Sequence, residues 1–210
     1  PARKRTATYK TNDLIINQHL RLMSLFNSKM KNRELTEAYR NILLVSDAFS
    51  NYYAYRNHRY YGAPHNFSLG GTPLDSTIVC AKTIVEEFKT KTKTQIVNVV
   101  FLSDGQSNRH MDYLTSENLV RGVSKRSLHI DDVKTRTRVY PTRKNGKQMD
   151  TTSIYLLALK EQLGINLLGF FLTSGGTRRT ASDIGWIMER YPTDEEVTKF
   201  RKEKFLIETE

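Results

Sequence analysis

Two short stretches of this sequence carry oxygen donors at places where a loop would present them. Residues 67–75 read FSLGGTPLD, with Thr72 after a glycine pair, and residues 96–105 read IVNVVFLSDG, with Asp104 at the end of an apolar run. A hydroxyl and a carboxylate are the hard donors that Mg²⁺ and Mn²⁺ prefer. The pattern favours a divalent-metal site; a plain helix start and a turn-capping aspartate are the alternatives. The residues that flank the two donors are Gly70, Gly71, Ser103 and Gly105.

Strands and helices of an α/β sheet would position these two donors. The β-branched run before Asp104 predicts a strand buried on both faces, as in a parallel sheet. Such strands end at the crevice where open α/β sheets bind ligands. The residues after Thr72 predict a helix, with Thr72 in the N-cap position and Pro73 in the first turn. Right-handed crossovers put both loops at the same edge, so we expect Thr72 and Asp104 to lie close together.

The pattern after Asp104 continues this alternation. A helix capped by Asp150 or Thr151 is predicted to stop at Gly164, and a buried strand is predicted over residues 165–173. Another helix is expected from about Ala181. This alternation predicts a doubly wound, partly parallel α/β fold over residues 67–192. The elements between residues 114 and 140 are not defined by the pattern, and Asn145-Gly146 allows a hairpin turn.

The ends of the chain differ from this α/β region. Residues 1–66 are predicted to form a basic arm, two helices and a Tyr-rich loop. The first helix would follow Asn12 or Asp13 and run to about Met30, and the second would run from about Glu34 to Asn51. The loop over residues 52–66 interleaves aromatic and basic side chains; it would cover the core edge or, alternatively, stack nucleic-acid bases. Residues 193–210 read as a charged helical tail.

Composition narrows the class of protein. The 210 residues carry a formal net charge of +11, and Cys80 is the one cysteine, so no internal disulfide forms. No apolar run reaches the length of a membrane span and no signal peptide opens the chain, which favours the cytoplasm. Cys80 sits in an apolar helical pattern typical of a core residue. The five histidines lack zinc-site spacing, and His110 alone falls near the predicted crevice.

The two loops together resemble the von Willebrand factor A domain with a metal-ion-dependent adhesion site (MIDAS). Such sites combine an Asp-x-Ser-x-Ser loop after the first strand, a threonine from a second loop and an aspartate that ends a later strand. Thr72 and Asp104 match the second and third parts. The Gly-Gly-Thr-Pro-Leu and Phe-Leu-Ser-Asp-Gly forms look closest to the CobT-like branch, named after a cobaltochelatase subunit. Further stretches resemble CobT-like proteins of large tailed phages: residues 8–13, 19–23 and 66–75.

The first MIDAS loop is not found in this sequence. Two other stretches pair an aspartate with a serine: Asp47-Ala-Phe-Ser50 falls inside a helical pattern, and Asp150-Thr-Thr-Ser153 reads as a helix cap. We expect the first strands of the fold to lie upstream of Pro1. The 97–102 strand would then expose an edge in this chain.

The resemblance implies a metal-dependent protein-binding module rather than an independent enzyme. It implies Mg²⁺ or Mn²⁺, held weakly without the first loop, and a protein partner such as an AAA+ ATPase, in the host cytoplasm if the chain is phage-encoded. A cobaltochelatase component is one alternative. The net charge raises another, nucleic-acid binding without a recognised motif. The candidate residues for binding a partner or nucleic acid are Arg143, Lys144, Arg178 and Arg179.

Overall fold

The computed structural model describes most of the chain in two units. Described are residues 9–16, 20–50, 71–104, 107, 111–117, 119–123, 129–132, 136–140, 143–144, 147–172, 185 and 192–203. The first unit comprises Pro1–Gln18 and Thr72–Glu210, and the second comprises His19–Gly71. The fold is mixed α/β, with one parallel and several antiparallel sheets among the described residues.

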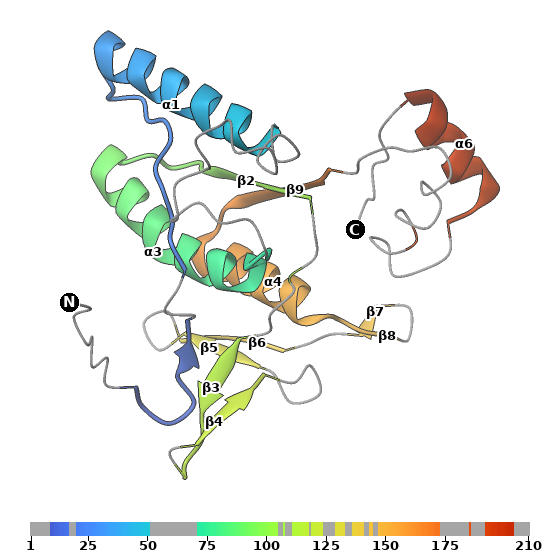
Figure 1. The fold of residues 1–210 in the computed structure, drawn as a ribbon. Helices are drawn as coiled ribbons and strands as arrows, with labels where there is room; N and C mark the ends of the chain where they lie inside the picture. Colours follow the sequence, from blue (N-terminus) through green and yellow to red (C-terminus); the bar gives the residue numbers. More distant parts are fainter. Residues whose placement is uncertain are drawn as a thin grey trace, which may run out of the picture. The chain divides into compact units, whose positions relative to one another are not determined.

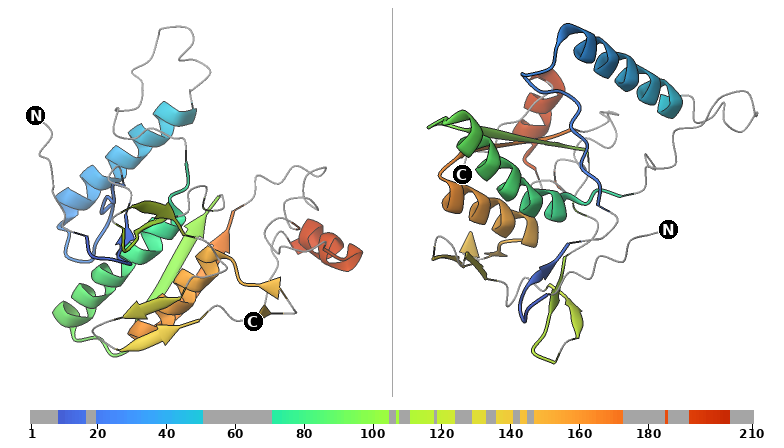
Figure 2. Two further views of the ribbon diagram at one scale, coloured as in Figure 1. Left: turned by 90° about the horizontal axis from the view of Figure 1, so that it is seen from below. Right: turned by 90° about the vertical axis from the view of Figure 1, so that its left-hand side faces the viewer.

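The centre of the first unit is a parallel pair of strands covered by two helices. β2 (Asn98–Ser103) pairs with β9 (Asn166–Phe171). α3 (Leu74–Thr92) precedes β2 in the chain, and α4 (Thr151–Leu163) precedes β9. The two helices pack side by side on one face of the pair (Figures 1 and 2). The crossover that a parallel pair needs is therefore the segment that contains α4.

Both ends of α4 follow the sequence prediction. Asp150 caps its first turn, because its carboxylate accepts hydrogen bonds from the Ser153 backbone N–H at 2.9 Å and from the Ser153 hydroxyl at 2.7 Å. Gly164 ends the helix in the left-handed region at φ 56°, which glycine adopts without a Cβ clash. The prediction of a helix that starts at Asp150 and stops at Gly164 is confirmed.

The hydrophobic core lies between the helices and the inner face of the β2–β9 pair. Phe101 of β2 and Leu167 of β9 pack against it from the sheet side. The buried core residues that these side chains meet are Ile78, Val85, Val97, Met111, Val123, Ile154, Tyr155, Leu159, Leu163 and Ile165. Burying these groups is the main favourable term that holds α3, α4 and the sheet together.

The outer face of the β2–β9 pair differs from the prediction. A strand buried on both faces was expected, but only alternate residues of β2 are shielded. Leu102 is 66% exposed, and Val100, Leu168 and Phe170 are also exposed. The prediction was wrong about the second face because α3 and α4 both cover the same side. Exposed apolar side chains on such a face are typical of a surface that another element covers.

The start of α3 also corrects a prediction. Pro73 occupies the N-cap position, and no side chain caps the helix, so Thr72 lies one residue before the cap. One orphan N–H of this turn, that of Asp75, donates instead to the hydroxyl of Ser107 in the loop after β2.

Short antiparallel strands fill the stretch between β2 and α4. β3 (Asp112–Leu114) pairs with β1 (Leu14–Ile15) and with β4 (Val120–Gly122), while β5 (Ile130–Asp132) pairs with β6 (Thr137–Val139). β7 (Arg143–Lys144) pairs with β8 (Lys147–Gln148) in antiparallel fashion, which agrees with the hairpin that Asn145-Gly146 allows; these two turn residues lie outside the described residues. The sequence pattern did not define β3 to β6, because each is only three residues long. The tail forms α6 (Asp194–Glu203).

The predicted helix from residue 12 to Met30 is wrong. Asn12 adopts φ 69° and its N–H donates to the Leu114 carbonyl at 2.7 Å, so the chain turns into β1 instead. Pairing of β1 with β3 supplies the hydrogen bonds that a helix would have made internally. No helix forms over residues 20–31, whereas α1 (Asn32–Ser50) confirms the second predicted helix.

The second unit contains α1 and the segment before it. The Phe26 ring lies against the Tyr39 ring at a centroid distance of 4.9 Å, which joins that segment to the helix. The predicted division of the chain near residue 66 stays a prediction. None of the helices in the described ranges is long and apolar enough to span a membrane.

Candidate metal edge and its supports

Thr72 and Asp104 lie on two loops that meet at one edge of the first unit. Thr72 stands two residues before α3, and Asp104 directly follows β2. The Asp75 backbone N–H donates to the Ser107 hydroxyl oxygen, with the nitrogen 3.3 Å from Oγ. Three residues of chain span at most about 11 Å, so Thr72 and Asp104 each lie within that reach of the contact. Thr72, Asp75, Asp104 and Ser107 are together called the metal edge below.

The side chain of Asp75 is enclosed at this edge. Its exposed fraction is 0%, and its Oδ1 accepts a hydrogen bond from the Thr152 hydroxyl at 2.5 Å. Its Oδ2 lies 3.4 Å from the Thr151 hydroxyl. Thr151 and Thr152 form the first turn of α4, so one carboxylate joins the starts of two helices. Two helix N-termini place partial positive charge near this buried carboxylate, which favours its charged form.

Asp75 is the residue that reasoning from the sequence missed. The sequence indicated only an acidic residue in the first turn of a helix, which is a common surface feature. Its contacts come from residues 76 and 77 positions further along the chain, so no local pattern predicts them.

Tyr155 packs beside this cluster, one turn further along α4. Its exposed fraction is 2%, and its hydroxyl has no hydrogen-bond partner in the described part of the chain. Burial, together with the negative charge of Asp75, raises the pKa of Tyr155 well above its ordinary value. The phenol therefore stays neutral, and the negative charge of the cluster rests on Asp75.

The donor types at the metal edge fit a hard cation, but their number is small. The Thr72 hydroxyl and the exposed Asp104 carboxylate are donors of the kind that Mg²⁺ and Mn²⁺ prefer, and together they would supply two of six ligands. Among the residues that the structure describes, no three His, Cys, Asp or Glu side chains gather into a metal-binding group. Neither substitute for the first MIDAS loop is available, because Asp150 caps α4 and Asp47 lies inside α1.

The other residues singled out in the sequence fall in different places. Ser103 ends β2 and Gly71 stands beside Thr72. Arg143 and Lys144 form β7, where the backbone alone is described. Outside the described residues lie Gly70, Gly105, His110, Arg178 and Arg179.

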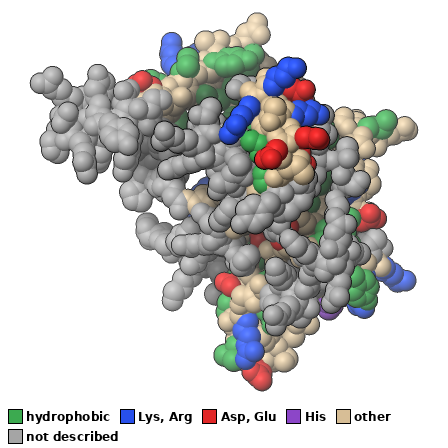
Figure 3. All heavy atoms as spheres, turned by 90° about the vertical axis from the view of Figure 1, so that its right-hand side faces the viewer, with side chains coloured by type: hydrophobic (Ala, Val, Ile, Leu, Met, Phe, Trp, Pro, Cys, Tyr) green, Lys and Arg blue, Asp and Glu red, His purple; other side chains and the backbone are tan. Residues whose placement is uncertain are grey.

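The lysines at the end of α3 have structural partners. Lys89 Nζ donates to the Leu163 carbonyl at 2.8 Å and so closes the last turn of α4, and Lys91 pairs with Glu87 at 2.9 Å. Among the coloured side chains in Figure 3, basic and acidic ones lie near one another. Lys89 and Lys91 are therefore engaged with partners inside the chain.

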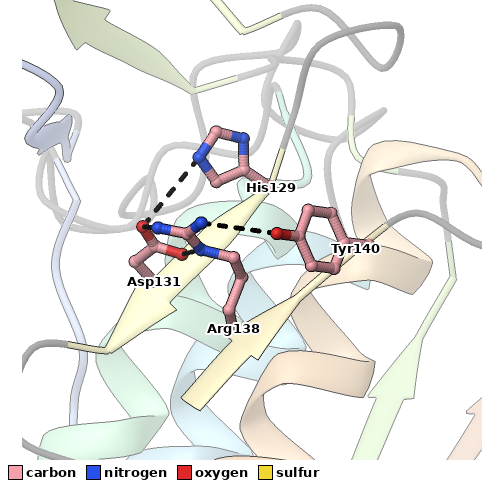
Figure 4. A network of polar contacts seen from close by, with 4 residues as sticks. All are labelled: His129, Asp131, Arg138 and Tyr140. Carbon is pink, nitrogen blue, oxygen red and sulfur yellow. Dashed lines mark hydrogen bonds and ion pairs between the residues drawn. The ribbon is translucent and has the colours of Figure 1, made fainter. Parts of the chain in front are cut away.

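A second polar network lies on the β5–β6 hairpin (Figure 4). Arg138 binds Asp131 through both carboxylate oxygens, at 2.6 Å and 2.7 Å, and reaches the Tyr140 hydroxyl at 3.3 Å. His129 Nε2 lies 3.9 Å from Asp131. These side chains are exposed, and hydrogen bonds from Arg138 lower the pKa of Asp131. The cross-strand pair fixes the hairpin register and leaves Arg138 committed to a carboxylate.

Cys80 is a poor candidate for a nucleophile. Burial raises the pKa of its thiol, which lowers the thiolate fraction at neutral pH. Its position on the partly buried side of α3 agrees with the packing role expected from the sequence.

Comparison of the chain with models of known protein families, with curated proteins and with solved structures finds no match.

Proposed function

We propose that this chain is a divalent-metal-dependent protein-binding module of the von Willebrand factor A kind, CobT-like in its loops. Thr72 and Asp104 would hold Mg²⁺ or Mn²⁺ at the metal edge. The observation that carries the proposal is the contact between the Asp75 N–H and the Ser107 hydroxyl, because it brings the loop before α3 to the loop after β2. These are the two loops that the resemblance assigns to the metal.

The arrangement of strands supports a doubly wound fold with further strands. The Val97 carbonyl accepts from Asn166 of β9, and the Ser103 carbonyl accepts from Leu172, which directly follows β9. These residues therefore direct their backbone polar groups toward β9. Because a strand alternates, Val100 and Leu102 direct theirs to the opposite edge of β2, where no strand of the described ranges pairs. A parallel sheet needs cover on both faces, and the exposed outer face of β2–β9 fits the same conclusion.

A two-donor site binds metal weakly by itself. Mg²⁺ gives up its hydration water reluctantly, so two protein oxygens leave most of its shell to water. A carboxylate from a bound partner would add a charged donor at the open positions. On this proposal the metal links the chain to its partner, and the resemblance points to an AAA+ ATPase as that partner, in the cytoplasm.

Titration of the intact chain with Mn²⁺ tests the proposal. Binding is followed by calorimetry and by loss of the free Mn²⁺ electron paramagnetic resonance signal. Thr72→Val removes the hydroxyl oxygen, and Asp104→Asn removes the negative charge of the carboxylate, each with little change in side-chain shape. Thr90→Val, at an exposed position of α3, and Asp112→Asn, at an exposed position of β3, are matched controls outside the two donor loops. We expect a dissociation constant in the millimolar range, raised at least about fivefold by the first two variants only. Equal binding by all five proteins, or none, contradicts the proposal.

The formal net charge of +11 supports a second candidate, binding to nucleic acid. Phosphate-driven binding falls steeply as salt rises, so titration of a labelled duplex and a labelled single strand at several salt concentrations is the test. Affinity that does not change with salt, or no binding at low salt, contradicts this candidate.

A further inference from the structure

We propose that Asp75 is the positioning residue of the metal edge: its side chain holds the start of α4 against the start of α3, while its backbone N–H holds the loop after β2. The inference deepens the proposed function, on which it rests for the identity of the bound ion. The inference also states that Asp75 links α3, α4 and the loop after β2. This linkage can be tested without metal.

Three elements converge on Asp75. From α4 come the Thr152 and Thr151 hydroxyls, which lie 2.5 Å and 3.4 Å from the two carboxylate oxygens. From the loop after β2 comes the Ser107 hydroxyl, which accepts from the Asp75 N–H at 3.3 Å. Asp75 itself belongs to the first turn of α3.

The burial of Asp75 indicates that this linkage is specific. A carboxylate with an exposed fraction of 0% is costly unless hydrogen bonds and positive charge surround it. The threonine hydroxyls and the N-terminal ends of α3 and α4 supply both. The hydroxyls of Thr151 and Thr152 lie within hydrogen-bond distance of the two carboxylate oxygens. Loss of either the charge or the Thr152 hydroxyl should therefore loosen the contact.

Asp75 lies close enough along the chain to Thr72 that a shift of Asp75 should also move this donor. Thr72 lies three residues before Asp75 along the chain, and Asp104 lies three residues before Ser107. A shift of the first turn of α3 relative to the β2 loop changes the Thr72–Asp104 separation. Metal ligands must stay within a few tenths of an ångström of ideal geometry, so small shifts cost affinity.

The experiment compares four variants of the intact chain. Asp75→Asn removes the charge and keeps the shape, and Thr152→Val removes the donor at 2.5 Å. Val85→Ala opens a cavity on α3 far along the helix from the edge and serves as a control for general destabilisation. Ser153→Ala, next to Thr152, loses a hydroxyl that bonds only Asp150 in the described contacts. Each protein is studied by hydrogen exchange without metal and by Mn²⁺ titration.

We expect a local change in hydrogen exchange. Asp75→Asn and Thr152→Val should speed exchange of amides at residues 74–78 and 152–155 by at least about fivefold, while amides at residues 86–92 stay within about twofold of the original chain. Val85→Ala should instead speed amide exchange at residues 86–92 more than at residues 74–78. Uniform acceleration along α3 and α4, or no change, overturns the positioning proposal whatever the metal does.

The Mn²⁺ titration separates this inference from the proposed function. If the original chain binds Mn²⁺, Asp75→Asn and Thr152→Val should weaken binding about tenfold while Val85→Ala and Ser153→Ala do not. Unchanged affinity in the first two variants overturns the positioning role. If the original chain binds no Mn²⁺ but the local exchange pattern is present, the proposed function fails while the three-element linkage stands.

Discussion

Lys82 Nζ lies 2.6 Å from Asp132 Oδ2, so an ion pair joins the middle of α3 to β5. The carboxylate is nearly enclosed, with 5% of the side chain exposed, whereas 25% of the Lys82 side chain is exposed. This pair anchors the β5–β6 hairpin to the helix layer. The loss of stability should therefore depend on which of the two partners is replaced.

Lys82→Met should destabilise the chain more than Asp132→Asn. The first change leaves a buried carboxylate without its cation, whereas the second leaves an ammonium that can reach water along its flexible stem. We expect losses of about 3 and about 1 kcal/mol in the free energy of unfolding, measured by denaturant titration. The double variant should recover part of the larger loss. An equal loss from both single changes would show that burial of the carboxylate does not set the cost.

Asp150→Ala should cost about 1 kcal/mol in the free energy of unfolding, because the Ser153 N–H loses its capping acceptor. Asp150→Asn keeps an acceptor oxygen and should recover most of this loss. Guanidinium titrations of the three proteins compare the transition midpoints. Equal losses from Ala and Asn would show that negative charge at the start of α4, rather than the hydrogen bond, is what Asp150 supplies.

Asp131 should titrate below its ordinary value of 3.8 because Arg138 donates to its ionised form. Since the pKa is lowered in the folded state, any stability from the pair is present above the unfolded pKa and is lost as pH falls through the folded one. A carbon-detected NMR titration of the carboxyl group measures the midpoint. Arg138→Gln should move the midpoint back toward 3.8, whereas Arg136→Gln, at an exposed position beside the hairpin turn, should not.

Leu102→Thr on the outer face of β2 should leave stability within about 0.5 kcal/mol, since this side chain is exposed and threonine suits a strand. Ile154→Ala in the core, where the exposed fraction is 0%, should cost about 3 kcal/mol. The same Leu102→Thr change should lower binding of a hydrophobic dye to the native chain, since it removes apolar surface. A large stability loss at Leu102 would mean that the outer face is packed.

Local sequence signals were sufficient where an element carries its own boundaries. Asp150 and Gly164 bound α4 because a side-chain cap and a left-handed glycine act within a few residues of the helix. The apolar run before Asp104 predicted β2 for the same reason, since β-branched residues between polar stretches favour a strand wherever they pack. Thr72 and Asp104 could be named as donor candidates from residue type and position alone.

Tertiary structure decided what local patterns cannot encode. Residues 12–16 carry a helical pattern but turn into β1, because β3, about 100 residues away, offers backbone partners. Both covering helices lie on the same face of β2–β9, which leaves Leu102 outside rather than buried. Asp75 looks like an ordinary first-turn residue in the sequence, yet folding encloses it among groups from α4 and the β2 loop. The sequence alone determined which side chains could act as donors at the edge. Only the fold decided that Asp75 is the buried carboxylate at the metal edge, because its partners are far from it in the sequence and reach it only when the helices pack.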